Sequence, residues 1–435
     1  LVAVSCKTSN RLVAVGSVDR AADRPVSIAP AEINTLRDEP LIRVRIRRGV
    51  PDASLDRAGP WVVAVSGARV GEVVSGPARV VAAGGAIQIM DRSGRVTGFP
   101  RGATVFAAPH GAADGRGTVT VDGADFPGTL RLVPGADART LDVVNVTDIE
   151  DYLPGVVSKE LIQGWHDTAF RVQAVAARTF ALQRREAARR TDRHFDVEST
   201  TTDQVYGGTT RLGVAHAAVE ATRGVVLIDG AKLGQAYYSS TCGGRPGLPE
   251  EIWPAQASAG GTVALVAQSR AQVDGKVDRD VLCDNSPLYR WQVVRRTDEL
   301  AQRISAWAIA NRITAAASMR GLSEIRATEF GVSGRPIRFV VADRRGVRTE
   351  LTGEQLRIAC NFAASGLPEV PKQSRVNSND MQFDVSESVV RIEGRGFGHG
   401  VGMCQFCTQG MAKRGDHWRD ILRSFYPDCE LRRVY

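Results

Sequence analysis

The spacing of apolar residues changes near residue 148, and this change constrains the fold more than any other feature of the chain. Before it, apolar residues alternate with arginines over Ile42–Arg47, which is the period of a half-buried strand. Further short apolar runs follow between turns that contain Gly, Asp or Pro: Trp61–Val65, Ala86–Met90, Thr118–Val121, Leu130–Val133 and Leu141–Val146. We therefore expect an all-β region over 36–145, preceded by a tail or linker over 1–35.

After this point, helical spacing and strand-like runs are mixed. Helices are expected near 169–188, near 213–223 before Gly224, and after the capping box Thr352-x-x-Gln355. A last helix is expected to be capped by Asp416. Short apolar runs predict strands at Val225–Ile228, Ile337–Val341 and Val389–Ile392. The predicted fold class is α+β, with an N-terminal all-β region followed by a mixed α+β catalytic core over 146–435.

Composition narrows the classes of partner. The chain has 435 residues, a formal net charge of +8 and a pI near 9.3. No apolar run is long enough to cross a membrane as a helix. The arginines are scattered, without the basic stripe interleaved with aromatic residues that nucleic-acid binding favours, so we expect no nucleic-acid partner. A diffuse positive charge suits a polyanionic cell envelope.

Glu160 is the strongest candidate for a catalytic group. It follows the apolar residues Leu153, Val156 and Val157 and lies just before Trp165 and the helix near 169–188. A carboxyl group with apolar neighbours tends to have a raised pKa and can donate a proton near neutral pH. The alternative is a solvated helix residue with no special role.

Several blocks of sequence resemble one family when they are taken in order. They are Asp148–Glu160, Gln173–Thr179, Thr202–Gly208, Val219–Leu227, Tyr238–Gly244, Gly396–Met403 and Gln409–Ala412. Together they resemble the core domain of the stage II sporulation protein D / amidase-enhancer family, over roughly residues 140–430. The resemblance implies a peptidoglycan lytic transglycosylase that cleaves glycan strands, with strands already stripped of stem peptides as one candidate substrate. It implies an extracytoplasmic location and no cofactor.

The same resemblance assigns roles to individual residues. Glu160 would be the single catalytic acid and base. The residues carried over as substrate-binding are Arg178, Gln204, Tyr206, Tyr238, His399 and Gln405. A second hypothesis is a non-catalytic wall-binding protein that enhances a cell-wall amidase, an N-acetylmuramoyl-L-alanine amidase.

The glycine-rich segment 394–402 has neither the Gly-Lys-Ser/Thr ending nor the Gly-x-Gly-x-x-Gly register of a nucleotide site. Glycines allow the backbone to approach a flat ligand closely, and His399 would then project into that approach. The groove role of His399 comes from the resemblance. The alternative is a structural histidine whose ring nitrogens are both hydrogen-bonded.

Seven cysteines leave two readings open. Cys6 follows a short apolar stretch and is a candidate for lipidation, and the other six suit either disulfides in an oxidising compartment or buried thiols. We favour a disulfide between Cys242 and Cys283. Cys404-x-x-Cys407 could be half a zinc site, a redox pair or two small residues on one helix face. Some members of the resembled family are thought to bind zinc through His and Cys near 238–244, but Tyr238 stands where they carry His, so we expect no metal.

Overall fold

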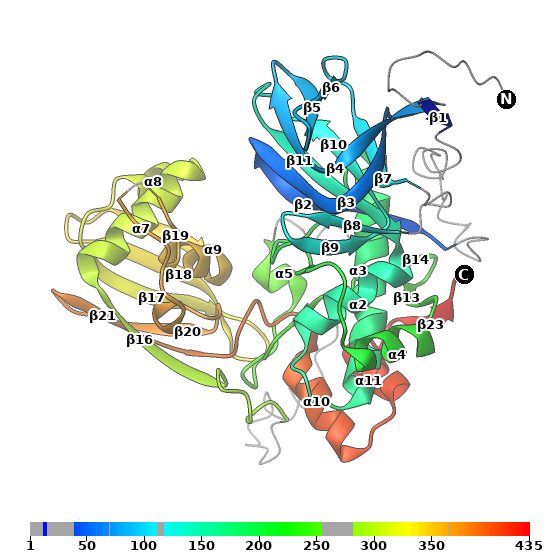
Figure 1. Ribbon diagram of the computed structural model, residues 1–435. Helices are drawn as coiled ribbons and strands as arrows, with labels where there is room; N and C mark the ends of the chain where they lie inside the picture. The colour runs from blue at the N-terminus through cyan, green and yellow to red at the C-terminus, as the bar shows by residue number, and fades with distance from the viewer. Residues whose placement is uncertain (1–11, 15–38, 69, 111–116, 255–281, 365) are drawn as a thin grey trace. The chain divides into compact units, whose positions relative to one another are not determined.

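The computed structural model describes residues 12–14, 39–68, 70–110, 117–254, 282–364 and 366–435 (Figure 1). The fold is α+β and its N-terminal region is rich in strands, which confirms the predicted class. Two compact units are present. Unit 1 comprises 1–164, 173–233 and 431–435, and unit 2 comprises 165–172 and 234–430. Cys6 and most of the predicted tail lie outside the described residues, and the predicted boundary near residue 146 stays a prediction.

A large sheet dominates unit 1, drawn mostly from blue to cyan in Figure 1. Its main path runs β12-β2-β11-β10-β7-β3-β4-β5-β6, and β1, β8 and β9 pair beside it. The alternation over Ile42–Arg47 is confirmed, because Ile42, Val44 and Ile46 are buried and their neighbours are not. The bounds are β1 Leu12–Ala14, β2 Leu41–Val50, β3 Asp52–Val65, β4 Val70–Ala83, β5 Ala86–Asp91, β6 Val96–Gly98, β7 Val105–Pro109, β8 Thr118–Val121, β9 Ala124–Pro127, β10 Thr129–Pro134, β11 Leu141–Asp148 and β12 Val197–Glu198.

Helix α2 (Ile149–Glu160) begins directly where β11 ends, and α3 (Asp167–Arg190) and α4 (Gly213–Ala221) follow it. The last two confirm the helices expected near 169–188 and 213–223. A small sheet of order β14-β13-β23 completes the unit, with β13 at Val225–Asp229, β14 at Lys232–Leu233 and β23 at Glu430–Arg433. A Cβ atom on Gly155 would lie 2.1 Å from the carbonyl oxygen of Gly208. Glycine at this point of α2 therefore allows the loop before α4 to pack against the helix.

Unit 2 contains two three-stranded sheets, of order β16-β21-β20 and β17-β18-β19. Their strands and the helices α7 and α9 enclose one apolar core that includes Trp291, Trp307, Phe339 and Cys360. The bounds are β16 Arg290–Arg296, α7 Thr297–Ala310, α8 Thr314–Ala317, β17 Leu322–Phe330, β18 Pro336–Asp343, β19 Arg348–Thr352, α9 Gly353–Cys360, β20 Met381–Val385 and β21 Val389–Arg395. The predicted strands near 337–341 and 389–392 are confirmed.

The rest of unit 2 surrounds a short parallel pair formed by β15 (Tyr238–Ser239) and β22 (Met403–Cys404). The other elements are α5 Pro249–Ile252, the 3₁₀ helix η2 Lys372–Ser374, α10 Gln405–Arg414 and α11 Trp418–Phe425. The capping box of Thr352 and Gln355 is present at α9, as predicted. The predicted cap Asp416 is wrong: the N-cap of α11 is His417, whose Nδ1 accepts the backbone N–H of Arg419, while Asp416 pairs with Arg414.

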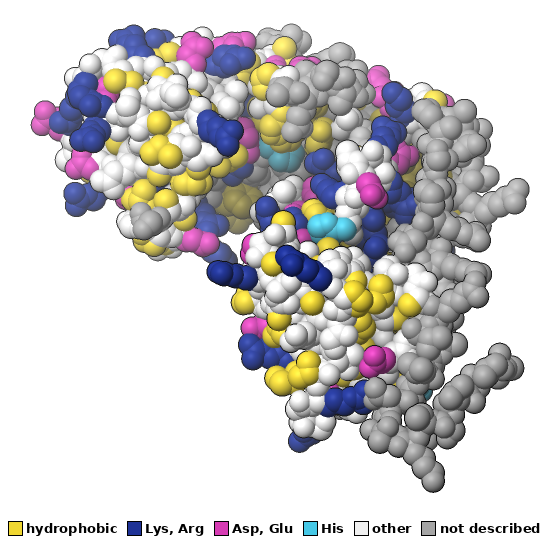
Figure 2. Space-filling view, turned by 90° about the horizontal axis from the view of Figure 1, so that it is seen from above, with side chains coloured by type: hydrophobic (Ala, Val, Ile, Leu, Met, Phe, Trp, Pro, Cys, Tyr) yellow, Lys and Arg dark blue, Asp and Glu magenta, His cyan; other side chains and the backbone are white. Residues whose placement is uncertain are grey.

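In the face seen in Figure 2, the described Lys and Arg side chains are dispersed among acidic, apolar and uncharged ones. Within the described part of the chain, no helix has both the length and the apolar character needed to cross a membrane.

Candidate functional site

Glu160 is the last residue of α2, and its side chain is half-buried. The C-terminal end of a helix disfavours negative charge, which favours the protonated form that a general acid requires. Lys159 and Gln163, which flank Glu160 in sequence, both line a pocket of about 200 Å³. Glu160 is therefore placed in the helical turn that forms one wall of this pocket.

The pocket beside α2 is lined by small and polar groups. Its walls are formed by Gly155, Ser158, Lys159, Gln163, Gly207, Gly208, Thr209, Thr210 and Leu212. Hydroxyl, amide and ammonium groups are suited to hydrogen-bond the hydroxyls of a sugar. A Cβ atom on Gly207 would lie 2.6 Å from Cε of Lys159, so a side chain there would displace the lysine. None of these lining residues is Asp or Glu.

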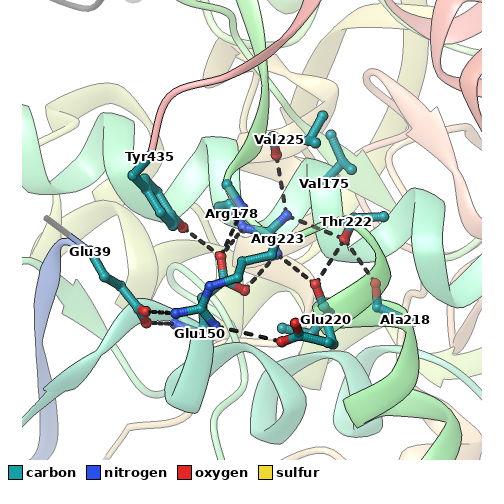
Figure 3. Close-up of polar contacts among 12 residues, drawn as sticks. Glu39, Glu150, Val175, Arg178, Ala218, Glu220, Thr222, Arg223, Val225 and Tyr435 are labelled. Carbon is teal, nitrogen blue, oxygen red and sulfur yellow. Dashed lines mark hydrogen bonds and ion pairs between the residues drawn. The ribbon is translucent and has the colours of Figure 1, made fainter. Parts of the chain in front are cut away.

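Arg178 lies in the interior of unit 1 and is fully buried (Figure 3). Its guanidinium donates to both carboxylate oxygens of Glu150, at 2.8 and 2.7 Å, and to the carbonyl oxygens of Val219 and Val225. Glu150 also accepts from the hydroxyl of Tyr435 at 2.5 Å. Burial opposes ionisation of Glu150, but Arg178 and these donors together hold the pKa of its carboxyl below the usual value.

This network gives Arg178 a structural role in place of the predicted contact with substrate. Its donors are used inside the protein, and a buried ion pair of this kind is costly to break. The sequence resemblance carried Arg178 over as substrate-binding, and the geometry gives that assignment no support.

Gln204 and Tyr206 are also interior residues. Gln204 is fully buried, accepts from the hydroxyl of Tyr152 at 3.0 Å, and donates to the carbonyl oxygen of Ala177. The ring of Tyr206 lies 4.7 Å from that of Tyr152, and its hydroxyl donates to Asn145 at 3.2 Å. Both residues position the loop that follows β12. As they stand, they shape the pocket wall from behind.

His399 lies in the glycine-rich turn of unit 2 and is half-buried. Its Nδ1 accepts the backbone N–H of Val401 at 3.0 Å, and its ring is also hydrogen-bonded to the backbone of Tyr238. Burial lowers the pKa of His399 to about 4, against the opposing charge of Glu354. These contacts are those of a neutral histidine that fixes its turn, which was the alternative to a groove role.

An aromatic group lies beside this histidine. The ring of Trp253 is 4.8 Å from that of His399 and 5.1 Å from that of Tyr237. Tyr238, the next residue, is half-buried in β15 and pairs with Met403 of β22. Half-buried aromatic rings of this kind can present apolar faces to a sugar ring.

Gln405, the first residue of α10, is buried. The same helix contacts the segment Trp165–Val172, which belongs to unit 2. The ring of Trp165 meets that of Phe406 edge-on at 4.9 Å, and the backbone N–H of His166 donates to Gln409 at 3.0 Å. Helix α10 therefore holds the segment that follows Glu160 in the sequence.

Sequence reasoning missed a second pocket, of about 510 Å³, in unit 2. Arg245, Arg290, Arg326 and Arg395 line it together with Asp380. Burial and the neighbouring arginines lower the pKa of Arg395, and burial raises the pKa of Asp380. These residues come from separate strands and loops, so no local spacing could have indicated them.

Four cysteines of unit 2 form the only group of thiols near one another that the described residues contain. The sulfur atoms of Cys242, Cys283, Cys404 and Cys407 all lie within 4.8 Å of one another, and all four residues are buried. The predicted disulfide partners Cys242 and Cys283 are 3.8 Å apart at Sγ. The pairing stays a prediction, now with two further thiols beside it.

Comparison with known proteins places these residues in a family. The family described as Stage II sporulation protein (SpoIID) matches residues 137–228, which include α2, Glu160 and Arg178. The chain belongs to the SpoIID family. This confirms the resemblance drawn from the sequence blocks. A domain of unknown function (DUF8618) matches residues 266–402, which include both three-stranded sheets of the SpoIID-family chain's second unit.

Three relatives extend the match beyond the family's own segment. An uncharacterized protein of Brachyspira hyodysenteriae is 27% identical over 72% of this chain and 73% of its own length. The amidase enhancer of Bacillus subtilis is 27% identical over 72% of this chain but only 45% of its own length. Stage II sporulation protein D of Bacillus subtilis is 24% identical over 65% of this SpoIID-family chain and 74% of its own length.

Proposed function

We propose that this protein acts on the cell wall as a peptidoglycan lytic transglycosylase, with Glu160 as its single catalytic acid and base. Membership of the SpoIID family and the similarity to an amidase enhancer support a cell-wall-related function. The finer assignment rests on one observation. A half-buried glutamate ends α2 in the turn that walls a polar pocket.

The proposed reaction needs one carboxyl group that works twice. Glu160 first donates its proton to the bridging oxygen as the glycosidic bond breaks. The C6 hydroxyl of the muramic sugar then attacks its own anomeric carbon, and its proton passes to Glu160, which restores the acid. The products are a glycan with a free 4-hydroxyl and a 1,6-anhydro-muramyl end, so no water is consumed.

The composition of the pocket supports one acid over two. Hydrolytic glycosidases use a pair of carboxyl groups on either side of the bond. The residues lining the pocket beside α2 include no Asp or Glu, so Glu160 is the acid nearest to it in sequence. The intramolecular attack removes the need for a second carboxylate, because the substrate supplies its own nucleophile.

The remaining lining residues fit roles in binding. Ser158, Gln163 and Thr209 offer hydroxyl and amide groups for sugar hydroxyls, and Lys159 offers a cation for the lactyl carboxylate of a strand without stem peptides. Holding the C6 hydroxyl toward the anomeric carbon adds a proximity contribution to the rate. These glycan strands are the proposed partner.

The test is digestion of purified denuded glycan by wild type and by Glu160→Gln. We expect the variant to bind glycan but to form 1,6-anhydro ends about 100- to 10,000-fold more slowly, the usual contribution of acid–base catalysis. Asp151→Asn is the matched control, because Asp151 is an exposed acid on the same helix. Product formation by Glu160→Gln at the wild-type rate would remove the mechanism.

A second candidate is a non-catalytic role as a wall-binding enhancer of an amidase, favoured by the similarity to the Bacillus subtilis amidase enhancer. The two roles separate in one assay. Anhydro-muramyl products from protein and glycan alone indicate the enzyme. Binding without products, together with faster release of stem peptides when a purified amidase is added, indicates the enhancer.

Either role requires an extracytoplasmic location. The formal charge of +8 and the dispersed basic side chains suit a polyanionic wall (Figure 2). Fractionation of cells that express the full-length protein tests this proposal, and recovery of the chain only with cytosolic markers would contradict it.

A further inference from the structure

The four buried cysteines of unit 2 come from three separate segments. Cys242 follows β15, Cys283 lies in a turn before β16, and Cys404 and Cys407 lie at the start of α10. Their sulfur atoms nevertheless lie within 4.8 Å of one another. The other two described cysteines, Cys360 and Cys429, are not part of this group.

The sulfur separations fit a common ion at the centre of the group. Sγ of Cys242 is 3.8 Å from Sγ of Cys283 and 4.0 Å from Sγ of Cys407. A tetrahedral ion with Zn–S bonds of about 2.3 Å separates its sulfur ligands by about 3.8 Å. A disulfide would need about 2.0 Å.

The surroundings of Cys404 suit a thiolate. Its Sγ accepts two backbone N–H groups, from Cys242 and from Cys407, each at 3.4 Å. It also caps α10, so the positive end of the helix faces the sulfur. Such contacts stabilise negative charge on sulfur and fix the orientation of a ligand.

Cys360 shows what an ordinary buried thiol looks like in the same unit. It lies in the apolar core, and burial raises its pKa to about 12, so it stays protonated. No other cysteine belongs to its cluster. The convergence of four sulfur atoms is therefore not a general result of burying cysteines in this fold.

We propose that Cys242, Cys283, Cys404 and Cys407 bind one zinc ion through four thiolates. Each thiol loses its proton to solvent as the ion binds, and no electron transfer is involved. All four positions around the ion are filled by protein, which is the arrangement of a structural site and leaves no place for a substrate or water.

The ion would join segments that the sequence separates widely. It would link the end of β15 and the turn at Cys283 to the start of α10. The same helix holds Trp165 and His166 through Phe406 and Gln409. Zinc would therefore stabilise the framework around the segment that follows Glu160, without taking part in the chemistry.

The proposal departs from both sequence-based expectations, a Cys242–Cys283 disulfide and no metal. Cys404-x-x-Cys407 was recognised as half a site, but a second pair with the same spacing is absent. The structure supplies the other half from two cysteines that are 41 positions apart. Two disulfides are the competing outcome for the same four sulfur atoms.

The decisive measurement is zinc content of the full chain, purified without chelator and without added metal. We expect one zinc per chain by elemental analysis and native mass spectrometry, and all cysteine thiols free after the metal is removed in denaturant. Cys404→Ser should lose the zinc, whereas Cys429→Ser, a half-buried cysteine outside the group, should keep it. Zinc retained by Cys404→Ser would overturn the site.

A second measurement covers the case in which Cys404→Ser does not fold. Cobalt(II) added to metal-depleted wild type should give thiolate-to-cobalt absorption in the near ultraviolet and the intense visible bands of a tetrahedral site, and zinc should abolish both. A chain with two disulfides and no metal, or with iron as its stoichiometric metal, would overturn the proposal. Zinc content is independent of glycan cleavage, so its outcome does not depend on the proposed activity.

Discussion

The two ends of helix α2 carry glutamates with opposite surroundings. Glu150, in the first turn, is buried and ion-paired with Arg178, and it accepts from Tyr435 and the backbone of Gly224 (Figure 3). Glu160, the last residue, is half-buried in the turn that walls the pocket. The same residue type on one helix thus has a structural position at one end and an accessible one at the other.

The difference teaches how to separate the two roles by experiment. A saturated, buried carboxylate contributes to folding and has no lone pair left for a substrate. A carboxyl at a pocket wall can exchange a proton with a ligand and contributes little to folding. Changes at Glu150 should therefore alter stability, and changes at Glu160 should alter rate.

The largest expected effect is on rate, at Glu160. Besides the loss of activity given above, Glu160→Gln should change the free energy of unfolding by less than about 0.5 kcal/mol, because the residue is only half-buried and the amide is isosteric. Urea denaturation of the variant and wild type, measured beside the digestion assay, checks this. A large loss of stability would show that Glu160 is a second structural glutamate.

The next effect is on stability, at the other end of the helix. Arg178→Met should lower the free energy of unfolding by about 3–5 kcal/mol, because it leaves Glu150 charged and unpaired in the interior. Glu150→Leu combined with Arg178→Met should cost less than the sum of the single changes, because it removes both charges. Urea denaturation of the three variants measures this.

A surface pair provides the control for that cycle. Arg423 and Asp420 on α11 are 3.1 Å apart, and their side chains are 63% and 65% exposed. Arg423→Met should cost at most about 1 kcal/mol. If Arg178→Met were as mild as Arg423→Met, Arg178 would be free to serve substrate, as the sequence resemblance suggested.

Acid should weaken the Glu150 end selectively. The folded-state pKa of Glu150 is lowered, so this residue stabilises the fold above its unfolded value of 4.5, and that stabilisation is lost as the pH falls below 4.5. We expect Glu150→Gln to have a shallower loss of stability with falling pH than wild type. Glu160→Gln should keep the wild-type slope, and thermal unfolding at pH 3 to 6 checks both.

The sequence predicted the fold class and the position of Glu160 because these follow from local patterns. Alternation along a strand, helical spacing and a capping box depend on neighbours within a few residues, and each was found where expected. Glu160 stood out through its apolar neighbours in sequence. The cap at Asp416 failed because His417, one residue later, offers a nitrogen to the same helix start.

The roles of the other site residues could not be read in this way. A block such as Gln173–Thr179 fixes which residues belong together but does not say which of them face the interior. Arg178, Gln204 and Tyr206 are polar residues that are usually exposed, yet each is buried with its partners inside unit 1. The thiol group and the arginine-lined pocket depend on contacts between distant segments, which no local spacing encodes.

The smallest expected effect sharpens the comparison at the pocket itself. Lys159 is exposed and lines the pocket beside Glu160. An exposed ion pair contributes about 0.2–1 kcal/mol, so Lys159→Ala should raise KM for denuded glycan by about two- to fivefold and leave kcat nearly unchanged. Lys159→Arg should restore KM, and Lys232→Ala, an exposed lysine of β14, should leave it at the wild-type value. A fall in kcat for Lys159→Ala at unchanged KM would instead mean that the ammonium group acts on the transition state, so that Glu160 would not be the only charged group in this turn that serves the reaction.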